Sequence, residues 1–242
     1  FQERTAGLQH TTTSPWTAYS CCSRGTWFVK DLTMTDSITH EKKTEDCRLT
    51  LPTPEEMTTQ QRTIHDQIVS GPRKRLVGPL RAALHNPALA DKWQQLGQVL
   101  RFEISLPPHL KELAILVTAR RWSSQLEWGI HAGDAVKAGL KDDIIEAVRH
   151  CRAPDFKDDK AAAEIYEYAR LLVQTGDVTQ DAHHAIVARW DEVGVVELTA
   201  LVGYYSMVAM TLNAHRIPLP EGVQADLAGQ AGDLAVLPPA IP

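Results

Sequence analysis

The segment 107–131, PPHLKELAILVTARRWSSQLEWGIH, decides the fold of this chain. Its two leading prolines fit the first turn of a helix, where a missing backbone N–H costs nothing. Residues 110–117 are apolar over most of a helical circumference, which indicates a helix buried on all sides. A second helix follows from about Ser123 to Val136, and Gly139 behind it is a favourable C-terminal cap. The segment therefore predicts two consecutive helices in the middle of a helical core.

Helix signals continue on both sides of this segment. Asn86-Pro87 and Thr53-Pro54-Glu55-Glu56 each combine an N-cap residue with a proline at the first helical position. Pairs of alternating strands joined by two-residue turns are absent from the sequence. We therefore predict an all-α protein, a compact bundle of about seven to eight helices. The later helices are expected from Asp142 or Asp143 to before Pro154, at about Lys157–Gln174, at Thr179–Glu192 and at Val195–Asn213.

The chain divides into three parts by composition. Residues 1–50 show no apolar period and are rich in Thr and Ser, which is typical of a disordered leader. Residues 51–218 carry the helix signals and form the predicted domain. Residues 219–242 are interrupted by Gly and Pro and are expected to be a C-terminal tail. At about 150 residues per domain, a chain of 242 residues fits one domain with appendages.

Composition and charge exclude several classes of protein. Hydrophobic residues make up 43% and charged residues 23%, as in globular domains, so a chain disordered throughout is not expected. With 25 basic and 30 acidic residues, the chain lacks the basic surface of a nucleic-acid-binding module. The most apolar window, Val195–Leu212, is interrupted by polar residues and predicts a buried helix, not a membrane span. We expect a soluble protein with neither nucleic acid nor membrane as a partner.

The cysteines favour a reducing compartment. The four of them, Cys21, Cys22, Cys47 and Cys151, have neither zinc-finger spacing nor a Cys-x-x-Cys pair. A secreted domain held by disulfides would have a denser framework. Because no secretory apolar region or retention motif is found either, we expect a cytoplasmic protein.

Glu112 is the first candidate functional residue. It lies in a stretch that is otherwise apolar, and within one helical turn only His109 could pair with it. One interpretation places Glu112 beside Lys111 on a narrow stripe that faces solvent. The other buries it, and a buried Glu112 needs a partner from another helix.

Glu127 and His131 form the second candidate. They are four residues apart and share a helix face, and Ser124 lies one turn earlier on the same side. A carboxylate one turn from an imidazole can fix its tautomer and favour its protonated form, as general acid–base catalysis requires.

Three other interpretations of these residues remain open at this point. Ser124-x-x-Glu127 fits a capping box, which would explain both residues by helix initiation. A Glu–His pair on a surface helix would contribute only a few tenths of a kcal/mol. Glu112, Glu127 and His131 could also bind a metal, but two ligands on one helix are weak support, and we predict no metal.

The spacing Glu112-(x11)-Ser124-x-x-Glu127-x-x-x-His131, followed by Gly139-Leu140, resembles the carboxymuconolactone decarboxylase family. That family belongs to the all-helical alkylhydroperoxidase-D-like superfamily, and the resemblance covers about residues 75–215. In its peroxidase branch the motif is Glu, then Cys-x-x-Cys, then His. Ser124 and Glu127 stand at the two cysteine positions here. Peroxide reduction needs a thiolate and a resolving thiol, so these residues conflict with a peroxidase.

The resemblance therefore implies acid–base chemistry, a decarboxylation or related lyase reaction on a small carboxylated lactone or similar metabolite. In this interpretation His131 donates the proton and Glu127 orients the His131 imidazole. Glu112 tunes the protonation of the Glu127–His131 pair. The rival functions are an alkylhydroperoxidase- or peroxiredoxin-type antioxidant and a non-catalytic oligomeric binding protein.

The candidate substrate-binding residues are Ser124, Arg120, Tyr205 and His215. Tyr205 and His215 rest on the resemblance alone, and Arg120 has an alternative role in complementing the C-terminus of its helix. No cofactor is expected. The resemblance also implies a homo-oligomer, a trimer or a hexamer, and broadly apolar helices fit burial in such an interface.

Overall fold

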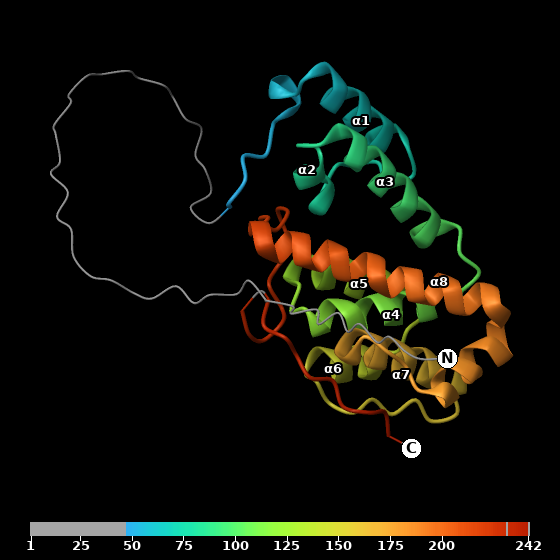
Figure 1. Cartoon of the computed structure of the whole chain (residues 1–242). Helices are drawn as coiled ribbons and strands as arrows, with labels where there is room; N and C mark the ends of the chain where they lie inside the picture. The colour runs from blue at the N-terminus through green and yellow to red at the C-terminus, as the bar shows by residue number, and fades with distance from the viewer. Residues whose placement is uncertain (1–46, 231, 242) are drawn as a thin grey trace, which may run out of the picture. The chain divides into compact units, whose positions relative to one another are not determined.

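The computed structural model describes residues 47–230 and 232–241, and within these residues it contains helices and no strand (Figure 1). The expected leader lies almost wholly outside the described residues. The all-α prediction is confirmed. In the described part of the chain a short 3-10 helix, Pro54–Glu56, precedes eight α-helices: α1 Thr59–Ser70, α2 Pro79–Ala83, α3 Pro87–Phe102, α4 Pro108–Arg121, α5 Gln125–Lys137, α6 Asp142–Arg149, α7 Lys160–Thr175 and α8 Gln180–His215.

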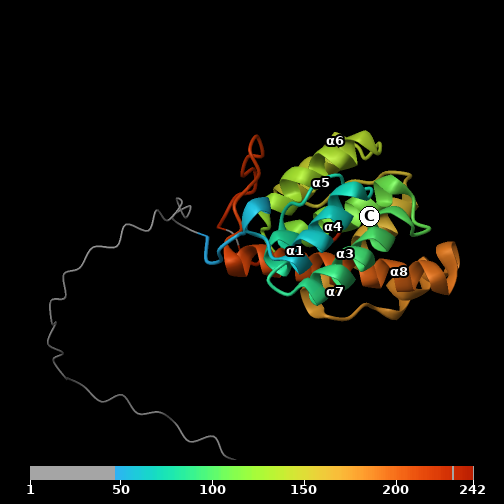
Figure 2. The same cartoon turned by 90° about the horizontal axis from the view of Figure 1, so that it is seen from above.

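Helix α4 is the centre of the domain. It contacts α5, α6, α7 and α8, and every residue from Glu112 to Arg120 is buried. This explains why its sequence shows no polar stripe. Helix α8 also contacts α2, α3 and α7, and Figures 1 and 2 show it running along the length of the domain.

Most predicted helix starts are confirmed, but α7 begins at Lys160 and not at about Lys157, and the short α2 was not predicted. Asn86 caps α3, since its Oδ1 accepts the N–H of Leu89 at 3.1 Å. The capping box at Thr53–Glu56 forms as expected, but it initiates only the single 3-10 turn. Helix α1 begins separately at Thr59, where Thr58 and Gln61 form a second capping box.

Helix α8 is broken where the sequence predicts a boundary between two helices. Asp191 has φ 56° and ψ −164°, outside the helical region, and its Oδ1 accepts the N–H of Val193 at 2.7 Å. Asp191 therefore caps the second segment in the way an N-cap residue does. Gly194 is required beside this break, because a Cβ there would lie 2.2 Å from the Cβ of Trp190.

Among its described residues the C-terminal segment has no helix, but it packs along the domain. Leu227 and Leu237 are buried. The side chain of Gln125 bonds both the N–H and the C=O of Leu227, and Gln174 bonds the N–H and C=O of Leu237. The tail predicted for residues 219–242 is therefore a strap across helices α5 and α7.

One helix in the described part of the chain, α8, is long and apolar enough to cross a membrane by length and composition alone. Its most apolar 18-residue window has a mean hydropathy of 1.5, and half of that window is buried inside the domain. The core helix of a soluble protein meets the same two criteria, so they are weak support for a span.

Gly97 lies where α3 passes close to α8, and it tests the tightness of this contact. A Cβ there would lie 2.1 Å from Oη and 2.7 Å from Cζ of the buried Tyr204. We expect Gly97→Ala to lower the free energy of unfolding by about 1–3 kcal/mol, because the Tyr204 ring must move. Gly133, exposed on α5 with no atom within 4 Å of an added Cβ, is the matched control.

The control should change stability in the opposite direction. Gly133→Ala removes backbone freedom from the unfolded chain and should raise the free energy of unfolding by about 0.5–1 kcal/mol. Urea unfolding followed by circular dichroism measures both variants. Effects of the same sign at the two positions would contradict the close approach at Gly97.

Candidate active site

His131 lies between two carboxylates in the interior of the domain. Its Nδ1 is hydrogen-bonded to Oε2 of Glu112 at 2.6 Å, and its Nε2 lies 3.7 Å from Oε2 of Glu127. The exposed fractions of His131, Glu112 and Glu127 are only 2%, 6% and 5%. The structure thus buries Glu112 and pairs it with a partner from another helix, and the solvent-facing interpretation is wrong.

The turn between α4 and α5 brings these groups together. Glu112 lies in the second turn of α4, and His131 lies one turn beyond Glu127 on α5. The chain reverses at Ser123, whose φ of 46° is in the left-handed region. The Ser123 hydroxyl accepts a hydrogen bond from Nη1 of Arg120 at 2.9 Å, which fixes the turn.

Arg120 is therefore not at the candidate site, and the prediction that it binds substrate is corrected. Its Nε donates to the C=O of Arg149 at 2.8 Å, at the C-terminal end of α6. Its guanidinium is used in joining α6 to the α4–α5 turn. The alternative role, complementing a helix C-terminus, is the observed one, although the helix is α6 and not its own.

Ser124 does not form the capping box that its sequence context allows. It occupies the N-cap position of α5, but its side chain makes no capping hydrogen bond. The Ser124 side chain is fully buried, and its Oγ finds no hydrogen-bond partner among the described residues. Helix initiation therefore explains neither Ser124 nor Glu127.

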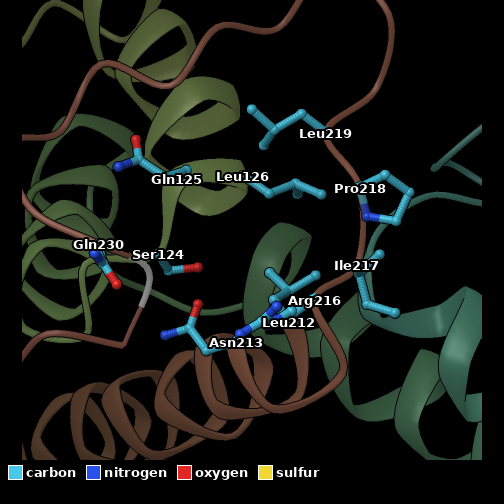
Figure 3. A pocket seen from close by; sticks show the side chains of 10 residues that line it. All are labelled: Ser124, Gln125, Leu126, Leu212, Asn213, Arg216, Ile217, Pro218, Leu219 and Gln230. Carbon is cyan, nitrogen blue, oxygen red and sulfur yellow. The ribbon is translucent and has the colours of Figure 1, made fainter. Parts of the chain in front are cut away.

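Ser124 instead lines a cavity of about 440 Å³ beside the α5 N-terminus (Figure 3). Polar side chains of Asn213 and Arg216 line the same cavity, together with apolar side chains that include Leu126 and Leu219. Figure 3 shows the Ser124 hydroxyl directed into the space between these residues. This cavity is large enough for a small metabolite, since ligand pockets typically measure about 300–1,000 Å³.

A smaller cavity of about 40 Å³ lies at the imidazole itself. It is lined by His131 and Glu127 and by Tyr205, whose ring meets the imidazole edge-on at a centroid distance of 5.0 Å. The resemblance pointed to Tyr205, and the structure places it here. Leu126 lines both cavities.

Two arginines that the sequence analysis missed, Arg73 and Arg101, also line the small cavity. Arg101 forms an ion pair with Asp134 at 2.7 Å, and Arg73 Nη2 lies 3.5 Å from the hydroxyl of Tyr204. No local pattern distinguishes these arginines from others in the chain, because only packing against α5 and α8 brings them to the site.

His215 was also expected at the site, and the structure places it elsewhere. Its side chain lines neither cavity. The carbonyl of His215 instead accepts the N–H of Arg48 at 3.0 Å, which ties the start of the described chain to the end of α8. Its expected role in substrate binding is corrected on this ground.

The burial of the site changes the proton affinity of its groups. Burial raises the pKa of Glu127, and the nearby side chains of His131, Arg101 and Arg73 oppose this shift only in part. Glu127 Oε2 has no hydrogen-bond partner among the described residues, which is consistent with a carboxyl that is poorly stabilised when charged. Burial also raises the pKa of Tyr205 well above its ordinary value, so this phenol remains neutral.

Neither a metal cluster nor a thiol pair is present in the described residues of the site. No group of three or more His, Cys, Asp or Glu side chains there could hold a metal ion. The described cysteines, Cys47 and Cys151, are free thiols that line neither cavity. Cys21 and Cys22 lie outside the described residues.

This arrangement of helices defines an alkylhydroperoxidase-D-like fold, and solved structures confirm it. A peroxidase-related protein from Silicibacter sp. TM1040 aligns with a TM-score of 0.60 at 11% identity, over 76% of this chain and 96% of its own. An alkylhydroperoxidase AhpD core protein from Ralstonia eutropha JMP134 aligns at 0.58 and 10% identity, over 73% and 93%. The debrominase Bmp8 aligns at 0.57 and 12% identity, over 76% and 96%.

The expected alkylhydroperoxidase-D-like fold is thus confirmed. No family model and no curated protein matches the sequence. At 10–12% identity the structural similarity carries no activity across, so function has to be argued from the residues of the site.

The buried carboxyl of Glu127 predicts a pH-dependent difference in stability. The pKa of Glu127 is higher in the folded state than in the unfolded state. Its contribution to the free energy of unfolding is therefore fully present below the unfolded pKa and is lost as the pH rises through the folded pKa. We expect Glu127→Gln to raise the free energy of unfolding at neutral pH by about 1–3 kcal/mol. The difference from the wild type should shrink towards zero in acid, where both side chains are neutral.

Urea unfolding of the two proteins at pH values from neutral down to about pH 4 measures this difference. Below about pH 4 the carboxyls of the unfolded chain are protonated. Exposed Glu221→Gln is the matched control and should show little difference at any pH. A stability gain for Glu127→Gln that is equally large in acid would contradict the burial of a poorly solvated carboxylate.

Proposed function

We propose that this chain is an acid–base enzyme that acts on a small carboxylated metabolite by decarboxylation or a related lyase reaction. The observation that carries the proposal is the buried imidazole of His131, held at 2.6 Å by Glu112 and facing Glu127 at 3.7 Å. A buried imidazole between two carboxyls is arranged to take up and deliver a proton. Both carboxyls come from the residues that the sequence analysis selected.

Each group has a distinct part in the proposed reaction. The short bond to Glu112 holds Nδ1, so Nε2 is the atom free to exchange a proton beside the small cavity. When the bond to the leaving CO₂ breaks, its electron pair stays on the substrate carbon, and His131 Nε2–H protonates that carbon. The positive charges of Arg73 and Arg101 would stabilise the enolate that forms between these steps.

The larger cavity is the proposed place of the substrate. The small cavity alone, at about 40 Å³, cannot hold a metabolite. In the adjacent space three features favour a carboxylate: the Ser124 hydroxyl, which has no hydrogen-bond partner among the described residues, the guanidinium of Arg216 and the N-terminal end of α5. A ligand there would reach His131 past the side chain of Leu126, which lines both cavities.

Peroxide reduction, the main rival, is disfavoured by the residues at the motif positions. Two structural neighbours are described as peroxidase-related, and one from Agrobacterium tumefaciens as a putative antioxidant defence protein. Ser124 and Glu127 contain no sulfur, so neither can form the sulfenic acid that this chemistry requires. A non-catalytic binding protein would keep the same cavity and is distinguished by the next experiment.

Replacing His131 by Gln tests the proton donor. Since general acid–base groups typically contribute factors of about 10²–10⁴, we expect His131→Gln to lower kcat by about this factor. Helical content should remain, because the Gln amide can still donate to Glu112. The measurement is turnover of carboxymuconolactone and related small lactone acids, followed by the loss of substrate absorbance.

The matched control is His150→Gln, a half-exposed histidine at the end of α6 that bonds Glu146. It should turn over substrate like the wild type. If His131→Gln kept near wild-type turnover on a substrate that the enzyme accepts, the acid–base assignment would fail. Binding of these acids without any turnover by the wild type would support the binding-protein rival.

Thiol alkylation separates the proposal from the redox rival. Because no described cysteine lines the site, we expect iodoacetamide treatment to leave turnover unchanged. Mass spectrometry confirms which of the four cysteines are modified. Complete inactivation by alkylation, with Cys21 or Cys22 modified, would favour thiol chemistry instead.

A further inference from the structure

The outer face of α8 carries a continuous apolar stripe. Beyond the break at Asp191, residues at alternating spacings of three and four are all exposed and uncharged. This alternation is the heptad pattern with which helices form coiled-coil pairs. We call this stripe the α8 seam, and it consists of Val193, Val196, Ala200, Gly203, Met207, Met210 and Ala214.

The α8 seam is too long and too apolar to be ordinary surface. From Val193 to Ala214 it extends about 33 Å at 1.5 Å per residue. Val196 is 66% exposed and Val193 is 57% exposed. A single exposed apolar residue needs no explanation, but these two belong to a row of seven. A contiguous apolar surface of this length marks an interaction site.

We infer that a second copy of this chain covers the α8 seam, with the two α8 helices antiparallel about a two-fold axis at Gly203. In this register Ala200 faces Met207 of the second copy, and Val196 faces Met210. Val196 and Ala200 then each meet a methionine, Val193 meets Ala214, and glycine meets glycine at the axis, where helices can approach closely. A parallel pair in register would place methionine on methionine and leave a gap at glycine.

The charges at the two ends of the seam agree with this direction. Asp191 and Glu192 make the N-terminal end acidic, while Arg48, whose Nη1 donates to the carbonyl of Ala214, makes the C-terminal end basic, and all three are exposed. An antiparallel pair places acidic ends beside basic ones, and a parallel pair places like charges together. No described atom lies within 4 Å of a Cβ built on Gly203, so the centre of the seam is open.

The inferred interface lies directly behind the candidate site. Tyr204 and Tyr205 follow Gly203 in sequence, are buried, and line the small cavity on the opposite side of α8. Each copy therefore keeps its own complete site, and the inference does not depend on the reaction proposed above. Because the axis is two-fold, the assembly has an even number of chains, as in a dimer or a hexamer, and is not a trimer.

A charge exchange across the α8 seam tests both the interface and its direction. Ala200→Glu and Met207→Lys are made singly and together in the full chain. Each single variant buries an unpaired charge, and we expect it to weaken association by at least about 100-fold. In the antiparallel register the double variant places the introduced carboxylate of one copy opposite the introduced ammonium group of the other, so association should largely return.

Analytical ultracentrifugation gives the association state, with circular dichroism to confirm folding. The matched control is Val136→Glu, which charges a valine that is 53% exposed on α5 outside the seam and should leave assembly unchanged. A wild-type chain that is a monomer or a trimer at micromolar concentration overturns the inference, whatever the variants do. Wild-type assembly of the Ala200→Glu variant would also overturn the inference. A double variant that stays dissociated would overturn the antiparallel register.

Discussion

The hydrogen bond between His131 and Glu112 is the interaction on which the rest of the structure depends. It joins α4 to α5 through two side chains that are almost completely removed from water. Because a buried polar group without a partner is costly, neither residue could occupy the core alone. The central position of α4, the left-handed turn at Ser123 and the packing of α8 through Tyr205 all serve to enclose this pair.

Stability alone does not account for this cluster. A buried set of charged groups can often be replaced by apolar side chains of similar volume without loss of stability. Glu127 adds to the cost, since its Oε2 has no hydrogen-bond partner among the described residues and burial raises its pKa. Groups with perturbed proton affinity that gather beside a cavity are typical of catalytic sites, so the proposed chemistry would give a reason to keep them.

The sequence predicted those features that are local in the chain. Caps and prolines located most helix starts, and the four-residue spacing placed Glu127 and His131 on one face of α5. The apolar surroundings of Glu112 correctly required a partner from another helix. Long-range packing decided the rest: Arg73 and Arg101 reach the site from distant segments, while Arg120, close by in sequence, turns to the carbonyl of Arg149. The cavity at Ser124 could not be predicted, because it forms between α5, the end of α8 and the C-terminal strap.

Helix α8 shows how one apolar helix can serve two surfaces. Its hydropathy is high enough for a membrane span, yet half of its most apolar window is buried against the core. The buried side supplies Tyr204 and Tyr205 to the small cavity, and the exposed side is the α8 seam. An amphipathic helix would need only one apolar stripe, so the second stripe requires its own explanation. The inferred pairing of two copies would supply it, because the same helix would then lie between the site of each chain and the interface.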